Sequence, residues 1–203
     1  MLGRKQNINN DEWIEAILNI ESTISRDEIE RLTESALCDI KKHINGMRAA
    51  YAWSGGKDSI ALGDICQKAG INNCMIGVCD LEYPEFIKWI KDNKPKNCDI
   101  INTGQDIEWL SKNQDMLFPS DSATAAKWFS IVQHRAQGKY VKENNIDILL
   151  LGRRKADGNF VGGDKKIYTN SKGVTRYSPL ADWRHEDILA YIYYNKLKLP
   201  PIY

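Results

Sequence analysis

Short apolar runs alternate with longer amphipathic segments along most of the chain. The apolar runs cover residues 49–53, 74–79, 98–102 and 146–151. The first two runs have the pattern of strands that are buried on both faces of a parallel sheet, whereas the run 98–102 is a shorter and weaker pattern. Helical patterns between them predict βαβ units with right-handed crossovers. The expected fold class is α/β, a doubly wound and mainly parallel sheet flanked by helices.

The segments between the expected strands have apolar residues at helical spacing. The expected helices run from Ser59 to about Gly70, onward from Pro84, over 122–144, and after Asp182 as their cap. Two further amphipathic helices, at 12–20 and 25–44, precede the first strand. We therefore expect an N-terminal helical extension over 1–47 and one α/β domain over 48–203. The extension is expected to pack on the sheet or to supply a surface for a homodimer.

A glycine-rich turn follows the first expected strand. It consists of Ser54, Gly55, Gly56, Lys57, Asp58 and Ser59. The two glycines allow backbone conformations and close approaches that a side chain would block. The next helix presents N-terminal amides and the positive end of its dipole, to which Lys57 adds an ammonium group. The order of strand, glycine pair, lysine and helix favours phosphate binding over a simple strand-to-helix turn.

Polar side chains also follow the second and fourth expected strands. Asp80 ends the second strand, and Gly152, Arg153 and Arg154 end the fourth. Ligands of such sheets bind beyond the carboxyl ends of the strands. The planar guanidinium of arginine matches phosphate or sulfate oxygens, although a solvated basic loop is the simpler alternative. We expect the turn, Asp80 and Gly152 to bind the ligand. The expected catalytic residues are Lys57, Asp58, Arg153 and Arg154.

Charge is distributed unevenly along the chain. The segment 153–176 holds seven bases and two acids, a balance of +5, whereas the net charge of the whole chain is +1. A polyanion is therefore expected near this segment, and both a nucleotide and a nucleic-acid strand qualify. A partner protein is the other interpretation of this surface.

Composition and cysteine spacing exclude several classes of protein. The 203 residues, 42% hydrophobic and 27% charged, are typical of a globular protein. No apolar run is long enough to span a bilayer, and no signal-type apolar core follows Met1, so we expect a cytoplasmic protein with no membrane partner. None of the five cysteines forms a C-x-x-C pair, so neither zinc nor an iron-sulfur cluster is expected, and no residue is assigned to a metal. Cys79, beside Asp80, is expected to pack in the core, with a redox role as the alternative.

The full string of the turn, from Ser54 to Ser59, does not have the Walker A spacing, because Tyr51 stands where that motif needs a glycine. It resembles the PP-loop, the pyrophosphate-binding loop of the adenine nucleotide alpha-hydrolase-like superfamily. The resemblance implies that the ligand is ATP or a related adenine nucleotide such as PAPS, with Mg²⁺ offsetting its phosphate charge. It also implies chemistry at the alpha phosphate.

A narrower resemblance covers residues 48–203. The run Pro179-Leu180-Ala181-Asp182-Trp183, the acids Glu186 and Asp187, the Tyr191-Ile192 pair and the closing Leu199-Pro200-Pro201-Ile202-Tyr203 resemble the end of the PAPS reductase and ATP sulfurylase small-subunit family. Asp80 with Pro84-Glu85 resembles the motif after its second strand. Gly152-Arg153-Arg154 resembles its substrate-binding arginine loop. This resemblance implies a role in sulfur metabolism or in sulfur-based modification.

The sequence also departs from that family. Leu81-Glu82 stand where the family has Thr-Gly, and Arg184 stands where it has a helix-capping threonine, so Asp182 is the expected substitute cap. The printed sequence ends at Tyr203, before the tail cysteine that takes the sulfur in reductases of the family.

We therefore expect an ATP-binding enzyme that performs adenylyl transfer or pyrophosphate release. One alternative is a sulfonucleotide reductase that uses Cys79 or a partner's thiol. Another is a nucleotide-sensing subunit without turnover.

Overall fold

A six-stranded sheet forms the centre of the computed structural model, which describes residues 15, 17–118, 121–171 and 173–200. The strand order is β3-β2-β1-β4-β6-β5, and every neighbouring pair is parallel except β5 and β6. The strands are β1 (Ala49–Ala52), β2 (Cys74–Val78), β3 (Cys98–Asn102), β4 (Ile148–Leu150), β5 (Ile167–Thr169) and β6 (Thr175–Tyr177). The four strands expected from the apolar runs are all present, and the predicted fold class is confirmed.

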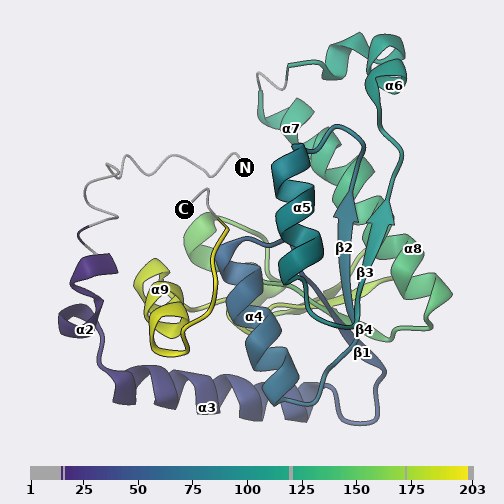
Figure 1. Cartoon of the computed structure of the whole chain (residues 1–203). Coiled ribbons are helices and arrows are strands. Elements are labelled where there is room, and N and C mark those ends of the chain that lie inside the picture. The colour runs from purple at the N-terminus through teal and green to yellow at the C-terminus, as the bar shows by residue number, and fades with distance from the viewer. Residues whose placement is uncertain (1–14, 16, 119–120, 172, 201–203) are drawn as a thin grey trace.

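Helices cover both faces of the sheet (Figure 1). They are α2 (Ile20–Thr23), α3 (Arg26–His43), α4 (Lys57–Lys68), α5 (Pro84–Asn93), α6 (Ile107–Lys112), α7 (Ser122–Phe129), α8 (Arg135–Glu143) and α9 (His185–Tyr194). Short 3₁₀ turns occur at η1 (Gln114–Met116), η3 (Lys155–Asp157) and η4 (Gly163–Lys165). Gly70, with φ +86°, follows the end of α4 as expected of a terminating glycine.

Side chains of β1 alternate between two apolar cores, one on each face of the sheet. Ala49 and Tyr51 belong to a core shared with α3, α4, α5 and α9. Ala50 belongs to a second core, built with α8. Because both faces are covered, β1 has no polar residue, and the sequence pattern of a buried parallel strand is explained.

The N-terminal helices contribute to the larger core. Ser25 caps α3 by accepting a hydrogen bond from the Glu28 amide, as the pattern predicts. Ile20, Ile29 and Ile40 are buried in the core that α4 and α9 share. Figure 1 shows α3 lying across the ends of α4 and α9. Residues 12–14 and 16 of the helix expected at 12–20 lie outside the described residues, and the homodimer stays a prediction.

The long helix expected over 122–144 is interrupted by a π-helical segment. This segment, η2 (Ser130–His134), joins α7 to α8. It packs tightly on β2, because a Cβ on Gly77 would lie 2.8 Å from the Cβ of Ala136 and 3.2 Å from the carbonyl oxygen of Val132. Gln133 Nε2 also donates to the Gly77 carbonyl at 3.0 Å. Such π segments are rare and frequently occur at functional sites.

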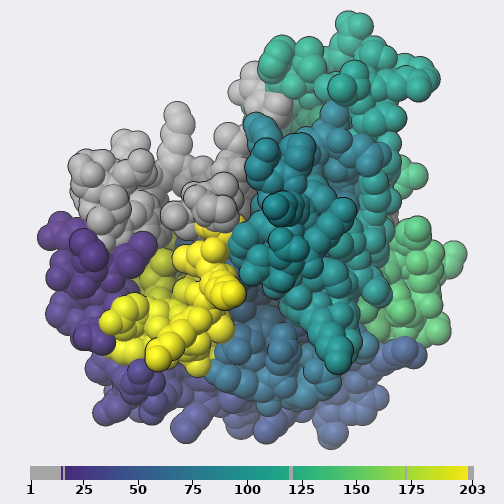
Figure 2. Space-filling view, viewed as in Figure 1, coloured from purple at the N-terminus to yellow at the C-terminus, as the bar shows by residue number. Residues whose placement is uncertain are grey.

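Helices α6 and α7 form a projection above the sheet, teal in Figure 2. Trp109 and Trp128 pack together inside it, with ring centroids 5.5 Å apart, and the Trp128 indole donates to the Met116 carbonyl. Ile107 and Phe118 are each 78% exposed on this projection. It is therefore held by a small aromatic core of its own.

Strands β5 and β6 form an antiparallel hairpin. Strand β6 also pairs in parallel with β4 and so extends the sheet. The sequence did not predict β6, because it contains Arg176. That side chain is only 3% exposed and donates to Gln137 Oε1 at 2.9 Å. A buried charge whose partner is distant in the sequence conceals the strand pattern.

The expected cap of the last helix is wrong. Asp182 does not cap α9, since it pairs with Lys155 at 2.7 Å and with Lys166 at 2.9 Å. Arg184 holds the N-cap position, and its backbone N–H donates to Asp187 Oδ2 at 2.7 Å. Asp187 is the third residue of α9, so its carboxylate can reach back to the backbone of the N-cap residue. Asp182 lies two residues before the N-cap position and therefore does not cap the helix.

Candidate functional site

The strand order places three of the predicted ligand-binding segments side by side. Strand β1 lies between β2 and β4, so the loop 54–59 is flanked by Asp80 and by Gly152. The chain moves from β1 through β2 to β3 and then returns to the other side of β1. Ligands of doubly wound sheets bind at such a reversal. The expected convergence of these strand ends at one edge therefore agrees with the topology.

Hydroxyl groups hold the loop 54–59 in shape. Ser59 Oγ donates to the Gly56 carbonyl at 2.9 Å and accepts bonds from both the amide and the hydroxyl of Ser54. Gly55 has φ +73°, and Gly56 is the N-cap of α4. Among the described residues, no side chain caps the N-terminus of α4 through a hydrogen bond. The two serines thus fix the turn, and the helix end lies at the switch point.

Gly152 brings the end of β4 against this loop. A Cβ at this position would lie 3.0 Å from the carbonyl oxygen of Asp58 and 3.2 Å from the amide nitrogen of Ser59. A side chain here would therefore push the first turn of α4 away from the sheet. The close approach of backbone to backbone accounts for glycine at the end of the fourth strand.

Arg154 is fully buried, with 0% of its surface exposed. Its Nε lies 2.7 Å from Asp58 Oδ1, and one terminal nitrogen donates to Asp157 Oδ1 at 2.9 Å. The other Asp58 oxygen lies 2.8 Å from Lys57 Nζ. Arg154 was expected to contact the ligand directly, but its guanidinium group is enclosed by protein. In this structure Arg154 holds the loop in position.

His185 completes this ion-pair network from the first residue of α9. Its Nδ1 lies 3.0 Å from a terminal nitrogen of Arg154, and its Nε2 lies 3.6 Å from Asp157 Oδ1. Because arginine can only donate, Nδ1 accepts and the proton of the neutral ring is on Nε2. Burial, followed by the charges of Arg154 and Lys57, lowers the pKa of His185. His185 and Asp157 were not expected at the site, because only the fold brings them to Arg154.

The depressed pKa of His185 predicts a pH dependence of stability. Below the ordinary histidine pKa the unfolded chain takes up a proton that the folded chain resists, so this contribution to stability is lost as the pH falls below about 6.5. We expect the melting temperature to drop less between pH 7.5 and pH 5 in His185→Gln than in the unmodified protein. Calorimetry at both pH values measures this, with His43→Gln as the control. An equal drop in the unmodified protein and in His185→Gln contradicts the assignment.

The side chain of Arg153 has different neighbours from the side chain of Arg154. It donates to the Tyr168 hydroxyl at 2.9 Å, and its other terminal nitrogen lies 3.3 Å from His134 Nε2. Its guanidinium carbon lies 5.6 Å from the centroid of the Phe129 ring. Within the described part of the chain, Arg153 forms no ion pair with a carboxylate. Burial also lowers the pKa of this side chain.

Asp80 is exposed at the same edge of the sheet. Its amide donates to the Gln105 carbonyl, and its carboxylate accepts a bond from Asn102 at 2.5 Å. Both oxygens of Asp58 are already paired with cations, which disfavours Asp58 as a direct ligand of Mg²⁺. The described residues contain no group of three or more potential metal ligands.

Cys79 is 8% exposed, and burial raises the pKa of its thiol. The thiolate is the reactive form of cysteine, so a raised pKa makes this thiol a poor nucleophile at neutral pH. The finding favours the packing interpretation over the redox interpretation of Cys79.

Most of the bases in the segment 153–176 have partners inside the protein. Besides the buried Arg154 and Arg176, Lys155 and Lys166 share the carboxylate of Asp182. Lys172 lies outside the described residues, and Lys165 is exposed. The surface available to a polyanion is therefore concentrated around Arg153 and Lys165. A nucleic-acid or protein partner here stays a prediction.

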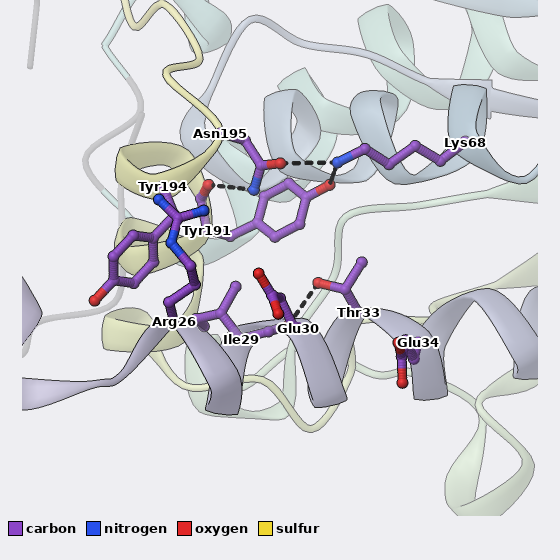
Figure 3. Close-up of a pocket in the computed structure, with 9 residues that line it drawn as sticks. All are labelled: Arg26, Ile29, Glu30, Thr33, Glu34, Lys68, Tyr191, Tyr194 and Asn195. Atoms are coloured by element: carbon purple, nitrogen blue, oxygen red, sulfur yellow. Dashed lines mark hydrogen bonds between the residues drawn. The ribbon is translucent and has the colours of Figure 1, made fainter.

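A pocket of about 200 Å³ lies between α3, α4 and α9 (Figure 3). Lys68, at the C-terminal end of α4, donates there to the Tyr191 hydroxyl and to Asn195 Oδ1. Since the phosphate loop precedes the other end of this 12-residue helix, roughly 18 Å separates the two regions. The pocket is distinct from the candidate site.

Fold and site together define an α/β protein of the adenine nucleotide alpha-hydrolase-like class. Residues 48–203 match the model of the phosphoadenosine phosphosulfate reductase domain, and the chain belongs to that family. No curated protein matches the chain in sequence. None of the described helices combines the length and the hydropathy that a membrane span needs.

Solved structures confirm the fold. The phosphoadenylyl-sulfate reductase from Candida auris, in a phosphate complex, has a TM-score of 0.64 at 17% identity, covering 88% of this chain and 91% of that one. The U34-tRNA thiolase NcsA from Methanococcus maripaludis has a TM-score of 0.57 at 17% identity, with 85% and 66% covered. The NH3-dependent NAD synthetase from Campylobacter jejuni has a TM-score of 0.57 at 14% identity, with 83% and 74% covered. At these identities the likeness concerns the fold alone.

Proposed function

We propose that the protein binds ATP on the loop 54–59 and catalyses adenylyl transfer or pyrophosphate release at the alpha phosphate. The single observation that carries this proposal is the geometry of the loop. Gly55 with φ +73° and the N-terminus of α4 lie at the switch point of the sheet. An anion is stabilised there by backbone amides and by the helix dipole.

Membership of the family supports an adenine nucleotide as the ligand. The neighbours in the fold include a tRNA thiolase and an NAD synthetase as well as a PAPS reductase. The buried Cys79 disfavours the reductase alternative, in which a local thiol would attack the sulfonucleotide. These points favour ATP chemistry over sulfonucleotide reduction.

Lys57 is the residue that we assign to the phosphates. Its side chain is 13% exposed, and its ammonium group pairs with Asp58 in the structure. We propose that it moves to the nucleotide phosphates and stabilises the charge of the departing pyrophosphate. Mg²⁺, bound chiefly by those phosphates, supplies additional charge neutralisation.

Asp58 and Arg154 have a positioning role in this proposal. Asp58 binds Arg154 through one oxygen and Lys57 through the other, so it links the buried network to the phosphate loop. When Lys57 turns to the nucleotide, Arg154 still compensates the Asp58 carboxylate. Arg153, on the acceptor side, is the arginine that we assign to the substrate.

ATP labelled at both the alpha and the gamma phosphate provides the test. Purified protein with Mg²⁺ is expected to release pyrophosphate, and Lys57→Ala is expected to lower the rate by about 10²–10³-fold. Lys112→Ala, which removes an exposed lysine on α6, is the matched control and is expected to retain the rate. The assay is run with and without sulfate and with single-stranded RNA as candidate acceptors.

Other products distinguish the alternatives. Release of gamma phosphate without pyrophosphate contradicts chemistry at the alpha phosphate. Tight ATP binding without turnover favours the nucleotide-sensing subunit. Thioredoxin-dependent sulfite release from PAPS that disappears in Cys79→Ser favours the reductase.

A further inference from the structure

Three aromatic rings and one imidazole ring surround Arg153 in the loop after β4. We name this group the ring cluster; it consists of Phe129, His134, Arg153, Phe160 and Tyr168. Three separate segments supply it: the junction of α7 with η2, the end of β4, and the hairpin with the loop before it.

The contacts of the ring cluster are continuous. The rings of Phe160 and Tyr168 meet edge to face with centroids 4.9 Å apart, and the Tyr168 hydroxyl accepts a bond from Arg153. On the other side of Arg153, Phe129 and His134 also meet edge to face at 4.9 Å. The guanidinium group therefore lies between two pairs of rings.

Two features of the ring cluster point to a missing ligand. Phe160 is 66% exposed and Phe129 is 44% exposed, so apolar ring faces are in contact with water beside a cation. Arg153 is half-buried and, within the described residues, has no carboxylate in an ion pair. A partly desolvated cation is stabilised when an anion pairs with it. A ligand with a flat ring next to a negative charge satisfies both features.

The ring cluster also borders the phosphate loop. Arg153 directly follows Gly152, where an added Cβ would lie 3.0 Å from the Asp58 carbonyl oxygen. A ligand on the ring cluster is thus placed at the end of β4, and a nucleotide on the loop lies at the end of the neighbouring strand β1. This is the position of an acceptor in the proposed adenylyl transfer.

We propose that the ring cluster binds single-stranded nucleic acid, and this proposal rests on the proposed function because it names the acceptor. Bases stack on Phe160 and Phe129, and a backbone phosphate binds Arg153, as in single-strand binding sites that combine rings with cations. Paired bases in a duplex are not available for such stacking. Sulfate, the other acceptor considered, does not require exposed rings.

Fluorescence anisotropy with labelled 12-nucleotide RNA, DNA of the same sequence and the matched duplexes tests the proposal. Single strands are expected to bind more tightly than duplexes, and Phe160→Ala is expected to weaken single-strand binding by about 5- to 150-fold. Phe118→Ala, at an exposed phenylalanine on the α6–α7 projection, is the matched control and is expected to bind as the unmodified protein does. Circular dichroism verifies that each variant is folded.

Arg153→Gln gives an independent measurement. Loss of one phosphate contact is expected to reduce the slope of log affinity against log salt concentration by about 0.7. Comparison of the affinities for single-stranded RNA and single-stranded DNA decides which of the two is the natural ligand. Absence of binding to both strands, equal affinity for duplexes, or an unchanged affinity in Phe160→Ala overturns the proposal.

Failure of this proposal can be separated from failure of the proposed function. Lys112→Ala, the control of the pyrophosphate assay, is expected to bind the oligonucleotide with unchanged affinity, because Lys112 lies on α6 and outside the ring cluster. A protein that binds single strands but releases no pyrophosphate contradicts only the ATP chemistry. A protein that releases pyrophosphate but does not bind single strands contradicts only the ring cluster.

Discussion

Replacement of Arg154 by methionine is expected to lower the free energy of unfolding by about 3–5 kcal/mol. Methionine fills much of the buried volume, but Asp157 loses its ion pair with Arg154, and Asp58 keeps only Lys57 as a paired cation. Removing one partner of a buried pair leaves an uncompensated charge, which is the costly outcome. Pyrophosphate release is expected to fall with it, because the phosphate loop loses the contact that fixes Asp58.

Urea unfolding of the unmodified protein and of the variant measures the loss. Lys112→Met breaks an exposed ion pair with Glu108 and is the control; no measurable change is expected there. Asp58→Asn and the double variant complete a cycle, in which a large coupling energy is expected. If Arg154→Met is as stable as the unmodified protein, Arg154 does not have the positioning role assigned to it.

The sequence predicted those parts of the molecule that depend on local pattern. Strands β1, β2 and β4 have unbroken apolar runs, and the loop 54–59 has its glycines and its lysine in one contiguous string. Because parallel strands end at the same edge, the sequence placed Gly152 at the same edge as that loop, whereas its position directly beside the loop depends on the strand order of the structure.

The parts that were missed depend on contacts between distant segments. Arg153 and Arg154 are adjacent in the sequence and have the same chemistry, yet one lies among rings and the other is fully buried against Asp58. Only the packing of η3 and α9 on the loop separates their roles. His185 was missed for the same reason, because only the tertiary fold brings the start of α9 to Arg154.

This division of roles changes the interpretation of the basic segment. Its charge excess indicated a broad polyanion surface, but most of its bases stabilise the loop or the hairpin. The charge that remains is local and lies beside exposed rings. A small, specific site for a strand is therefore favoured over extended electrostatic binding, and a weak salt dependence is consistent with it.

Substitution of Gly55 by alanine is expected to remove most nucleotide binding. With φ +73° the position costs an L-residue about 1–2 kcal/mol, and a Cβ would lie 3.0 Å from the Cζ3 atom of Trp89. Trp89 stacks on Trp53 at 5.7 Å, so the ring has little freedom to move away. The loop must shift instead, and its amides then leave the geometry that a phosphate needs. We expect ATP affinity to fall at least about tenfold, the factor that corresponds to 1.4 kcal/mol.

Gly46→Ala is the matched control, because Gly46 has φ +74° and no atom within 4 Å of the added Cβ. Both variants pay the same backbone cost, so the difference between them isolates the contact with Trp89. Titration calorimetry with ATP and thermal unfolding are measured on both. We expect similar losses of stability from the backbone, a further loss in Gly55→Ala, and a loss of ATP affinity in that variant alone. Equal ATP affinity in the two variants would mean that the nucleotide does not bind on the loop 54–59.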